Sequence, residues 1–288
     1  MATETASFGA GKRESHDATA FYGRRLLDHV PDPVSGDPQQ PPRSILDAFF
    51  TKSSETMEEI PDDCVALMVT SPPYNVGKEY DDDLSLADYL DLLHRVLKET
   101  YRVLEPGGRV AVNVANLGRK PYLPLNHYVA GMLSDIGFSL RGEIVWLKAA
   151  GAGGSCAWGS WRSAKNPTLR DVHEYVLVAG KGPYRRTRIG EDTISKDEFL
   201  EATTSVWTIA PASARRIGHP APFPVELPRR LIGLYTFRGD LVLDPFMGAG
   251  STAVAAVETG RHFVGYDIHE GYLDIARTRV AAVRGIRD

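Results

Sequence analysis

Residues 70–75, with the sequence Thr-Ser-Pro-Pro-Tyr-Asn, combine groups that can hold and polarise a planar amine. The Ser71 hydroxyl and the Pro72 carbonyl can both accept hydrogen bonds, Pro73 stiffens the backbone that aims them, and Tyr74 can stack on a ring. An amine attached to an aromatic ring is a poor nucleophile because its lone pair is delocalised, and two acceptors can draw it toward sp3 geometry. The pattern therefore predicts an amine-activating site. The alternative interpretation is a proline-rich turn that ends a strand.

A second pattern lies at 244–252, between an apolar run and a helical pattern, and reads Asp-Pro-Phe-Met-Gly-Ala-Gly-Ser-Thr. Glycines at a strand-to-helix turn let a ligand approach the backbone, and the next helix offers free N–H groups. Asp267 ends the following predicted strand, where its carboxylate can accept hydrogen bonds from ribose hydroxyls. No lysine follows Gly250, which favours a nucleoside without phosphates. The predicted ligand-binding residues are Asp244, Pro245, Phe246, Met247, Gly248, Gly250, Ser251, Thr252 and Asp267. The alternative is a tight turn with no ligand.

The elements that must position these residues alternate between short apolar runs and amphipathic segments, which predicts an α/β domain with a parallel sheet covered on both faces. Ser85 and Asp88 resemble a capping box that opens a long helix, which Pro-Gly-Gly at 106–108 ends. Strands are predicted at 65–69, 109–114, 139–147, 175–179, 241–246 and 262–268. Further helices are predicted at 125–135, 224–235, 251–259 and 270–283.

The 288 residues suit one large domain, or one domain with an insertion. Five prolines between residues 31 and 42 predict a flexible tail and linker at 1–42, followed by the domain at 43–288. No apolar stretch approaches the length of a membrane span and the N-terminus lacks a signal core, so a cytoplasmic location is expected. Cys64 and Cys156 form no ligand pattern, and no metal site is expected.

The formal net charge of -4 is unevenly distributed along the chain. The range 148–188 interleaves eight Lys and Arg with aromatic residues and contains two acidic residues, a composition suited to phosphate contact and base-edge readout. The predicted DNA-binding residues are Trp158, Trp161, Arg162, Lys165, Arg170, Arg185, Arg186 and Arg188. The alternative is a solvated basic surface. His173 and Glu174 are interpreted as structural because an apolar strand follows them.

Together, TSPPYN followed later by DPFMGAGST resembles the beta group of amino-methylating DNA methyltransferases, from about residue 43 to the C-terminus. The resemblance implies S-adenosyl-L-methionine as cofactor and a Rossmann-like, seven-stranded sheet with a terminal antiparallel strand and a circularly permuted motif order. The stretch HPAPFPVELPRRLI at 219–232 resembles a further cofactor-binding segment of that group, which places His219, Phe223, Pro224 and Glu226 near the methionine part. Many relatives carry Gly-Asp before the catalytic strand to contact the adenine amine, whereas this chain has Thr-Lys-Ser-Ser-Glu at 51–55.

The resemblance also implies a site-specific enzyme of the restriction-modification type that flips a base out of double-stranded DNA, with a target-recognition insertion at about 148–215. The base amine would attack the sulfonium methyl directly, and Ser71 at the first motif position favours cytosine N4 over adenine N6. A cognate restriction endonuclease and a homodimer are compatible with the resemblance, and the sequence decides neither. The alternatives are adenine N6, an RNA or protein amide as substrate, and a catalytically silent DNA-binding regulator.

Overall fold

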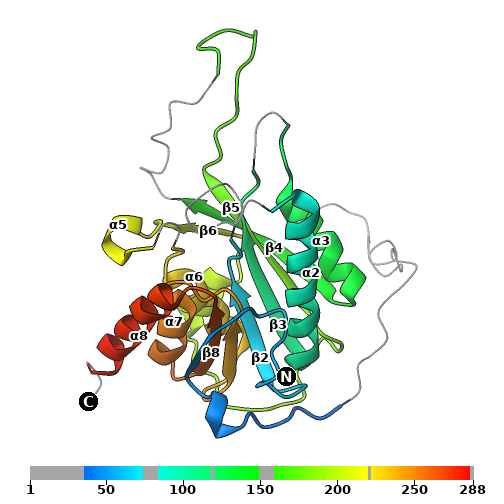
Figure 1. The fold of residues 1–288 in the computed structure, drawn as a ribbon, viewed down its shortest axis with the longest axis vertical. Helices are drawn as coiled ribbons and strands as arrows, with labels where there is room; N and C mark the ends of the chain where they lie inside the picture. The colour runs from blue at the N-terminus through cyan, green and yellow to red at the C-terminus, as the bar shows by residue number, and fades with distance from the viewer. Residues whose placement is uncertain (1–35, 74–83, 118–120, 149–158, 220–221, 286–288) are drawn as a thin grey trace, which may run out of the picture. The chain divides into compact units, whose positions relative to one another are not determined.

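The computed structural model describes residues 36–73, 84–117, 121–148, 159–219 and 222–285 (Figure 1). All of them belong to one compact unit, Pro33–Asp288. The predicted tail, 1–42, falls largely outside the described residues, and its last part already contacts the domain because the Gln39 N–H donates to the Asp63 carbonyl at 2.8 Å. A short 3-10 helix, Arg43–Ile45, then leads into the first strand.

Eight strands among the described residues form one sheet in the order β1-β8-β7-β2-β3-β5-β4-β6. All neighbouring pairs are parallel except the two pairs that β5 makes with β3 and β4. The strands are β1 (Ala48–Thr51), β2 (Val65–Thr70), β3 (Leu104–Val114), β4 (Ser139–Lys148), β5 (His173–Gly180), β6 (Val206–Ile209), β7 (Leu241–Asp244) and β8 (His262–Asp267).

The prediction of a Rossmann-like α/β sheet is confirmed, but the sheet has eight strands rather than seven, and its antiparallel strand β5 is internal rather than terminal. The two strands that the sequence did not reveal, β1 and β6, have four residues each and lie at the two edges of the sheet. A run of that length carries too little alternation to distinguish a strand from a loop.

Helices cover both faces of the sheet, α2 and α3 on one side and α6, α7 and α8 on the other (Figure 1). Each face has its own apolar core. The helices are α2 (Leu86–Val103), α3 (Leu125–Ile136), α4 (Lys196–Ala202), α5 (Ala214–Ile217), α6 (Glu226–Tyr235), α7 (Ser251–Glu258) and α8 (Glu270–Arg284). Within the described ranges, none of these helices is long and apolar enough to span a membrane.

The predicted cap of α2 is present, since the Ser85 hydroxyl accepts a hydrogen bond from the Asp88 N–H. The end of this helix differs from the prediction, because α2 ends at Val103 and the Pro-Gly-Gly sequence lies inside β3. Gly107 has φ +80, and a Cβ atom there would lie 2.7 Å from the Arg185 carbonyl oxygen. The glycine is thus required by the close approach of another chain segment as well as by its backbone angle.

The sheet order brings four strand ends to one place. In the parallel register Thr51 lies beside Asp267, and Asp244 lies beside Gly265, so β1, β8, β7 and β2 all finish at the same edge. The carboxyl ends of parallel strands are where ligands bind in open α/β sheets. The target-recognition insertion at about 148–215 stays a prediction. This range supplies β5 and β6 to the sheet, and its parts that leave the sheet at this edge are the connection from β4 to β5 and the residues that follow β6.

Candidate active site

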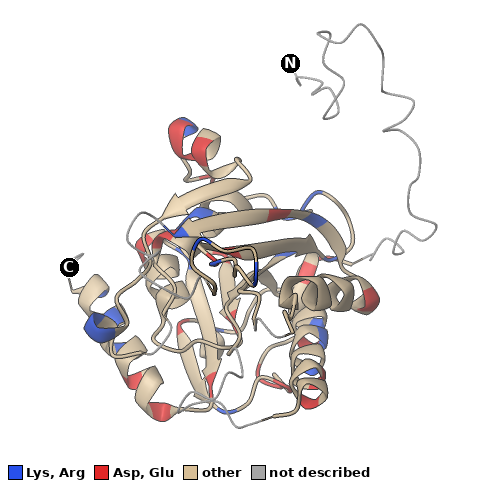
Figure 2. Cartoon of the chain, turned by 90° about the horizontal axis from the view of Figure 1, so that it is seen from above, with Lys and Arg blue, Asp and Glu red and all other residues tan. Residues whose placement is uncertain are grey.

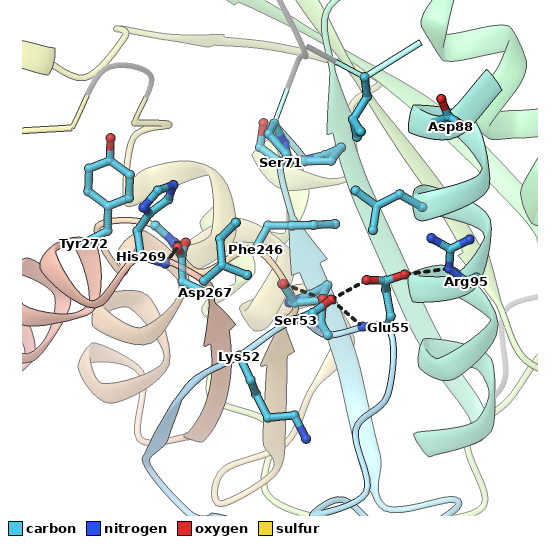
Figure 3. Close-up of a pocket in the computed structure, with 18 of the residues that line it drawn as sticks. Lys52, Ser53, Glu55, Ser71, Asp88, Arg95, Phe246, Asp267, His269 and Tyr272 are labelled. Carbon is cyan, nitrogen blue, oxygen red and sulfur yellow. Dashed lines mark hydrogen bonds and ion pairs between the residues drawn. The ribbon is translucent and has the colours of Figure 1, made fainter. Parts of the chain in front are cut away.

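A cavity of about 530 Å³ opens at the carboxyl edge of these strands (Figure 3). Its walls come from the segments that follow β1, β2, β7 and β8 and from the side of α2. The lining includes Lys52, Ser53, Ser54, Glu55, Ser71, Pro72, Pro73, Asp88, Arg95, His219, Pro245, Phe246, Gly248, Asp267, His269 and Tyr272. The two sequence patterns, about 170 residues apart, therefore meet in one cavity.

Asp244 ties the end of β7 to the end of β2 behind this cavity. Its carboxylate is fully buried and accepts hydrogen bonds from the hydroxyls of Thr70 and Thr252, each at 2.7 Å, and from the Phe246 N–H at 3.1 Å. Because Thr70 immediately precedes Ser71, this linkage holds the first motif against the second. Burial raises the pKa of Asp244 to about 6, although the three hydrogen bonds oppose that shift.

Asp244→Asn is expected to remove a pH-dependent part of the stability. Below about pH 4 the carboxyl is neutral in the folded and unfolded chains, and above about pH 6 it is charged in both. Its stabilising contribution is therefore complete at low pH and is lost as the pH rises through 6, by about 3 kcal/mol. Urea unfolding of both proteins between pH 4 and 7.5 measures this, and a constant difference in the free energy of unfolding would contradict it.

Asp267 lies at the end of β8 on the opposite wall from α2 (Figure 3). Its two carboxylate oxygens each accept one backbone hydrogen bond at 2.8 Å, from the N–H of Gly248 and from the N–H of His269. Burial raises the pKa of this carboxyl, and the two N–H groups oppose the shift. Each oxygen keeps a second lone pair, which can accept a hydrogen bond from a ligand hydroxyl.

Two aromatic side chains stand beside this carboxylate. The His219 ring packs edge-on against Tyr272, with centroids 4.5 Å apart, and Nε2 of His219 lies 2.9 Å from the position that a Cβ atom on Gly248 would occupy. The His219 ring can thus pack against the Gly248 backbone only because this residue has no side chain.

The stretch at 51–55, where the sequence lacks the Gly-Asp pair, contributes a different carboxylate to the cavity. The Ser53 hydroxyl donates to Oε2 of Glu55 at 2.8 Å, and Nε of Arg95 donates to Oε1 at 2.6 Å (Figure 3). These bonds hold the pKa of Glu55 below its usual value, the Ser53 bond most strongly, against the effect of burial. Sequence reasoning did not identify this Ser53 and Glu55 pair as a functional feature.

Ser71, Pro72 and Pro73 line the cavity as predicted positions of the first motif, whereas Tyr74 lies outside the described residues. Behind Ser71 is Asn113, the residue before the last of β3. Its amide nitrogen lies 3.3 Å from the Ser71 oxygen. The signal that could have revealed Asn113 is a polar residue within an otherwise apolar strand.

The predicted cofactor residues fall into two groups. Pro245, Phe246, Gly248, Asp267 and His219 line the cavity. The others are not among its lining residues, namely Asp244, Met247, Gly250, Ser251, Thr252, Phe223 and Pro224. Several of these support the wall instead, as Ser251 does by donating to the Phe223 carbonyl at 2.8 Å.

The place of Glu226 near the methionine part of the cofactor stays a prediction. This residue does not line the cavity and instead binds Arg229 and Arg230 of its own helix, at 2.6 and 2.8 Å. The reason is helical periodicity, because the charged residues three and four positions further along lie on the same face.

Two of the predicted DNA-binding residues require correction. Arg186 bridges Glu105 and Asp240 at 2.6 and 2.7 Å, and Arg188 binds Glu105 at 3.1 Å. The Arg186 side chain is only 9% exposed. Because β5 is antiparallel to β3, its end at Gly180 pairs with Arg109, so the segment that follows lies at the amino edge, away from the cavity. These arginines form ion pairs within the domain, and the exposed Arg185 lies in the same remote segment.

The other basic residues lie in the connection that begins at the cavity edge after β4. Its described part, 159–172, forms a loop closed by a bridge between Gly159 and Pro167, with Trp161 68% exposed. Figure 2 views the chain from above and shows basic positions on loops at this end of the sheet. Arg162, Lys165 and Arg170 are exposed, while Trp158 lies outside the described residues.

The sequence model of the N6/N4 type of DNA methylase matches residues 65–278, which include both motifs and most of the sheet. The chain belongs to this DNA methylase family. The prediction of a DNA-methylating enzyme is thereby confirmed at the level of the family, whose description covers both adenine N6 and cytosine N4.

Individual relatives agree with this assignment. Type II methyltransferase M.MthZI of Methanothermobacter thermautotrophicus is 29% identical over 270 residues, covering 81% of this chain and 76% of that protein. M.ScaI of Streptomyces caespitosus, also a Type II methyltransferase, is 30% identical over 255 residues and covers 81% of each chain.

Solved structures show the same fold. A DNA modification methylase of Thermus thermophilus, solved in complex with S-adenosyl-L-methionine, matches with a TM-score of 0.65 at 28% identity, covering 82% of this chain and 94% of that one. The cytosine-N4-specific PvuII DNA methyltransferase also has a TM-score of 0.65, covering 83% of this chain and 90% of its own, but at 19% identity it supports the fold alone.

Proposed function

We propose that this DNA methylase transfers a methyl group from S-adenosyl-L-methionine to the exocyclic N4 amine of cytosine in duplex DNA, at a specific site. The observation that carries the proposal is the shared cavity, with Ser71 and Pro72 on one part of its wall and Gly248 and Asp267 on another. One pocket thus holds acceptors for an amine beside a nucleoside-binding wall.

The residues present fit the cofactor, which the Thermus thermophilus relative also binds. Asp267 offers free lone pairs for ribose hydroxyls, and Gly248, whose N–H binds this carboxylate, lines the same wall of the cavity. The volume of about 530 Å³ is in the range of small-molecule sites. Glu55, held by Ser53 and Arg95, supplies a carboxylate that can accept from the adenine amine in place of the missing Asp. When bound, S-adenosylmethionine supplies an electrophilic methyl group.

Ser71 and the Pro72 carbonyl would accept hydrogen bonds from the target amine and hold its lone pair toward the methyl group. Catalysis then rests mainly on positioning, since reactants held in line avoid the entropic cost of a bimolecular encounter. Tyr74, by its sequence position, would stack on the target ring.

Duplex DNA conceals its base amines within the stack, so the target base must be flipped into the cavity. The loop at 159–172 lies at the same edge of the sheet and presents Trp161, Arg162, Lys165 and Arg170, which suit phosphate and groove contacts. A cognate endonuclease and a homodimer remain predictions from the family resemblance.

The choice of cytosine N4 rests on Ser71 at the first position of the catalytic motif. The test is to incubate the purified protein with unmethylated genomic DNA and methyl-labelled cofactor, then to digest the DNA and identify the labelled nucleoside by mass spectrometry. Label in N4-methylcytosine is expected. Label in N6-methyladenine would retain the mechanism and overturn the base assignment, and no label in DNA would point to another substrate or to a silent DNA-binding protein.

A further inference from the structure

Behind the catalytic serine, a row of polar side chains crosses three neighbouring strands. Nδ2 of Asn113 on β3 donates to Oε2 of Glu174 on β5 at 2.6 Å and to Oγ of Ser71 at 3.3 Å. Oε1 of Glu174 in turn binds Nζ of Lys148, the last residue of β4, at 2.6 Å. Asn113 and Glu174 are 1% and 7% exposed. Glu174, interpreted from the sequence as structural, is thus linked to Ser71 through one side chain.

We propose that Asn113, Glu174 and Lys148 form a positioning chain that holds the Ser71 oxygen ready to accept a hydrogen bond from the target amine. The proposal rests on the function proposed above. To the proposed methyl transfer it adds the residues that determine the orientation of the Ser71 hydroxyl.

The carboxylate fixes the orientation of the Asn113 amide. Glu174 is an acceptor, so turning the amide over would set the Asn113 carbonyl oxygen against a carboxylate oxygen. The NH2 end is therefore held toward both Glu174 and Ser71. Lys148 forms an ion pair with the other oxygen of this carboxylate and so helps to hold Glu174 in place.

The fixed amide in turn constrains Ser71. A hydroxyl has one donor and two acceptor lone pairs, and the Asn113 N–H uses one lone pair. Because Nδ2 cannot accept, the hydroxyl proton must point elsewhere than at Asn113, and this limits the orientations that the Ser71 hydroxyl can take. An amide cannot pass a proton on to Glu174 in this arrangement, so Glu174 is a positioning residue and not the base.

The positioning chain of Asn113, Glu174 and Lys148 is an unfavourable way to stabilise a fold. It places a nearly buried carboxylate in an ion pair with the partly exposed Lys148, and the Asn113 carbonyl oxygen has no hydrogen-bond partner among the described residues. Apolar side chains of similar size often stabilise a core as well as or better than a buried ion pair. Its presence next to Ser71 is accounted for by positioning.

A double-mutant cycle between Asn113→Leu and Ser71→Ala tests the proposal, with single-turnover methyl transfer as the readout. If Asn113 acts through Ser71, Asn113→Leu should lower the rate about 10-fold in the protein with Ser71 and less than about twofold in the Ser71→Ala background. Equal losses in both backgrounds would overturn the proposal. Labelled cofactor makes the slow double variant measurable.

Glu174→Gln keeps the shape of the side chain and guards against a folding failure of Asn113→Leu. It should lower the rate about 5- to 10-fold while binding S-adenosylhomocysteine within twofold of wild type. Glu143→Gln, the same change at an exposed residue of β4, is the matched control and should leave the rate unchanged. A loss of cofactor-product binding that parallels the loss of rate would indicate a merely structural role. If the wild-type protein transfers no methyl group to DNA, the proposed function itself fails.

Discussion

Ser71→Ala is expected to lower the single-turnover rate of methyl transfer about 100-fold, close to 3 kcal/mol of transition-state stabilisation. The Ser71 oxygen lines the cavity beside Pro72, and it is the side-chain acceptor of the motif that can hold the target amine as its lone pair becomes available for attack. The hydrogen bond strengthens as positive charge develops on that nitrogen, so its loss should affect the rate more than the binding of either substrate.

The affinity for S-adenosylhomocysteine should remain within twofold of wild type in this variant, because Asp267 and Gly248 lie on a different part of the wall. Ser134→Ala provides the matched control, since Ser134 is exposed on α3 and does not line the cavity. Full activity of Ser71→Ala would exclude the proposed role of the serine. Tyr74→Ala is expected to behave like Ser71→Ala on the basis of the sequence motif.

Gly248→Ala is expected to weaken binding of S-adenosylhomocysteine about 100-fold or more. The added Cβ would lie 2.9 Å from Nε2 of His219, and φ at this residue is +48, a conformation that L side chains rarely adopt. Either the His219 ring must leave its place against Tyr272, or the turn must move and release the N–H that Gly248 donates to Asp267. Both adjustments disturb the wall on which the nucleoside would lie.

Gly239→Ala is the control that separates the clash of the added Cβ with His219 from the cost of placing alanine at a positive φ. Gly239 has φ +79, and nothing lies within 4 Å of its Cβ position, so this variant should lose about 1 kcal/mol of stability and bind the ligand normally. Isothermal titration calorimetry, with thermal unfolding in parallel, measures both quantities. Equal affinities of the two variants would show that the turn at Gly248 does not contact the ligand.

Much of the fold follows from local patterns. The apolar run of β2 predicts a strand buried on both faces, and all six of its residues are buried. The periodic run of α2, with Ser85 as its cap, gives a helix at the predicted place. These signals are strong because each concerns residues close together in the chain, where backbone propensity and periodicity decide the structure.

The edge strands β1 and β6 were not predicted from their four residues. Each exists because a neighbouring strand offers unpaired backbone groups, β8 for β1 and β4 for β6. That condition depends on the whole sheet and has no counterpart in a short window of sequence.

The two motifs, their order and the chemistry that their residue types permit were determined by the sequence alone. Which residues meet was decided by the tertiary structure. The antiparallel direction of β5 carries Arg186 and Arg188 to the amino edge, where they pair with Glu105, and brings Glu174 to the catalytic edge beside Asn113. The local excess of basic residues assigned the first pair to DNA binding, and the apolar strand after Glu174 led to its interpretation as structural. The physical reason is that strand direction sets the edge at which a side chain emerges, and this direction is fixed by pairing between distant segments.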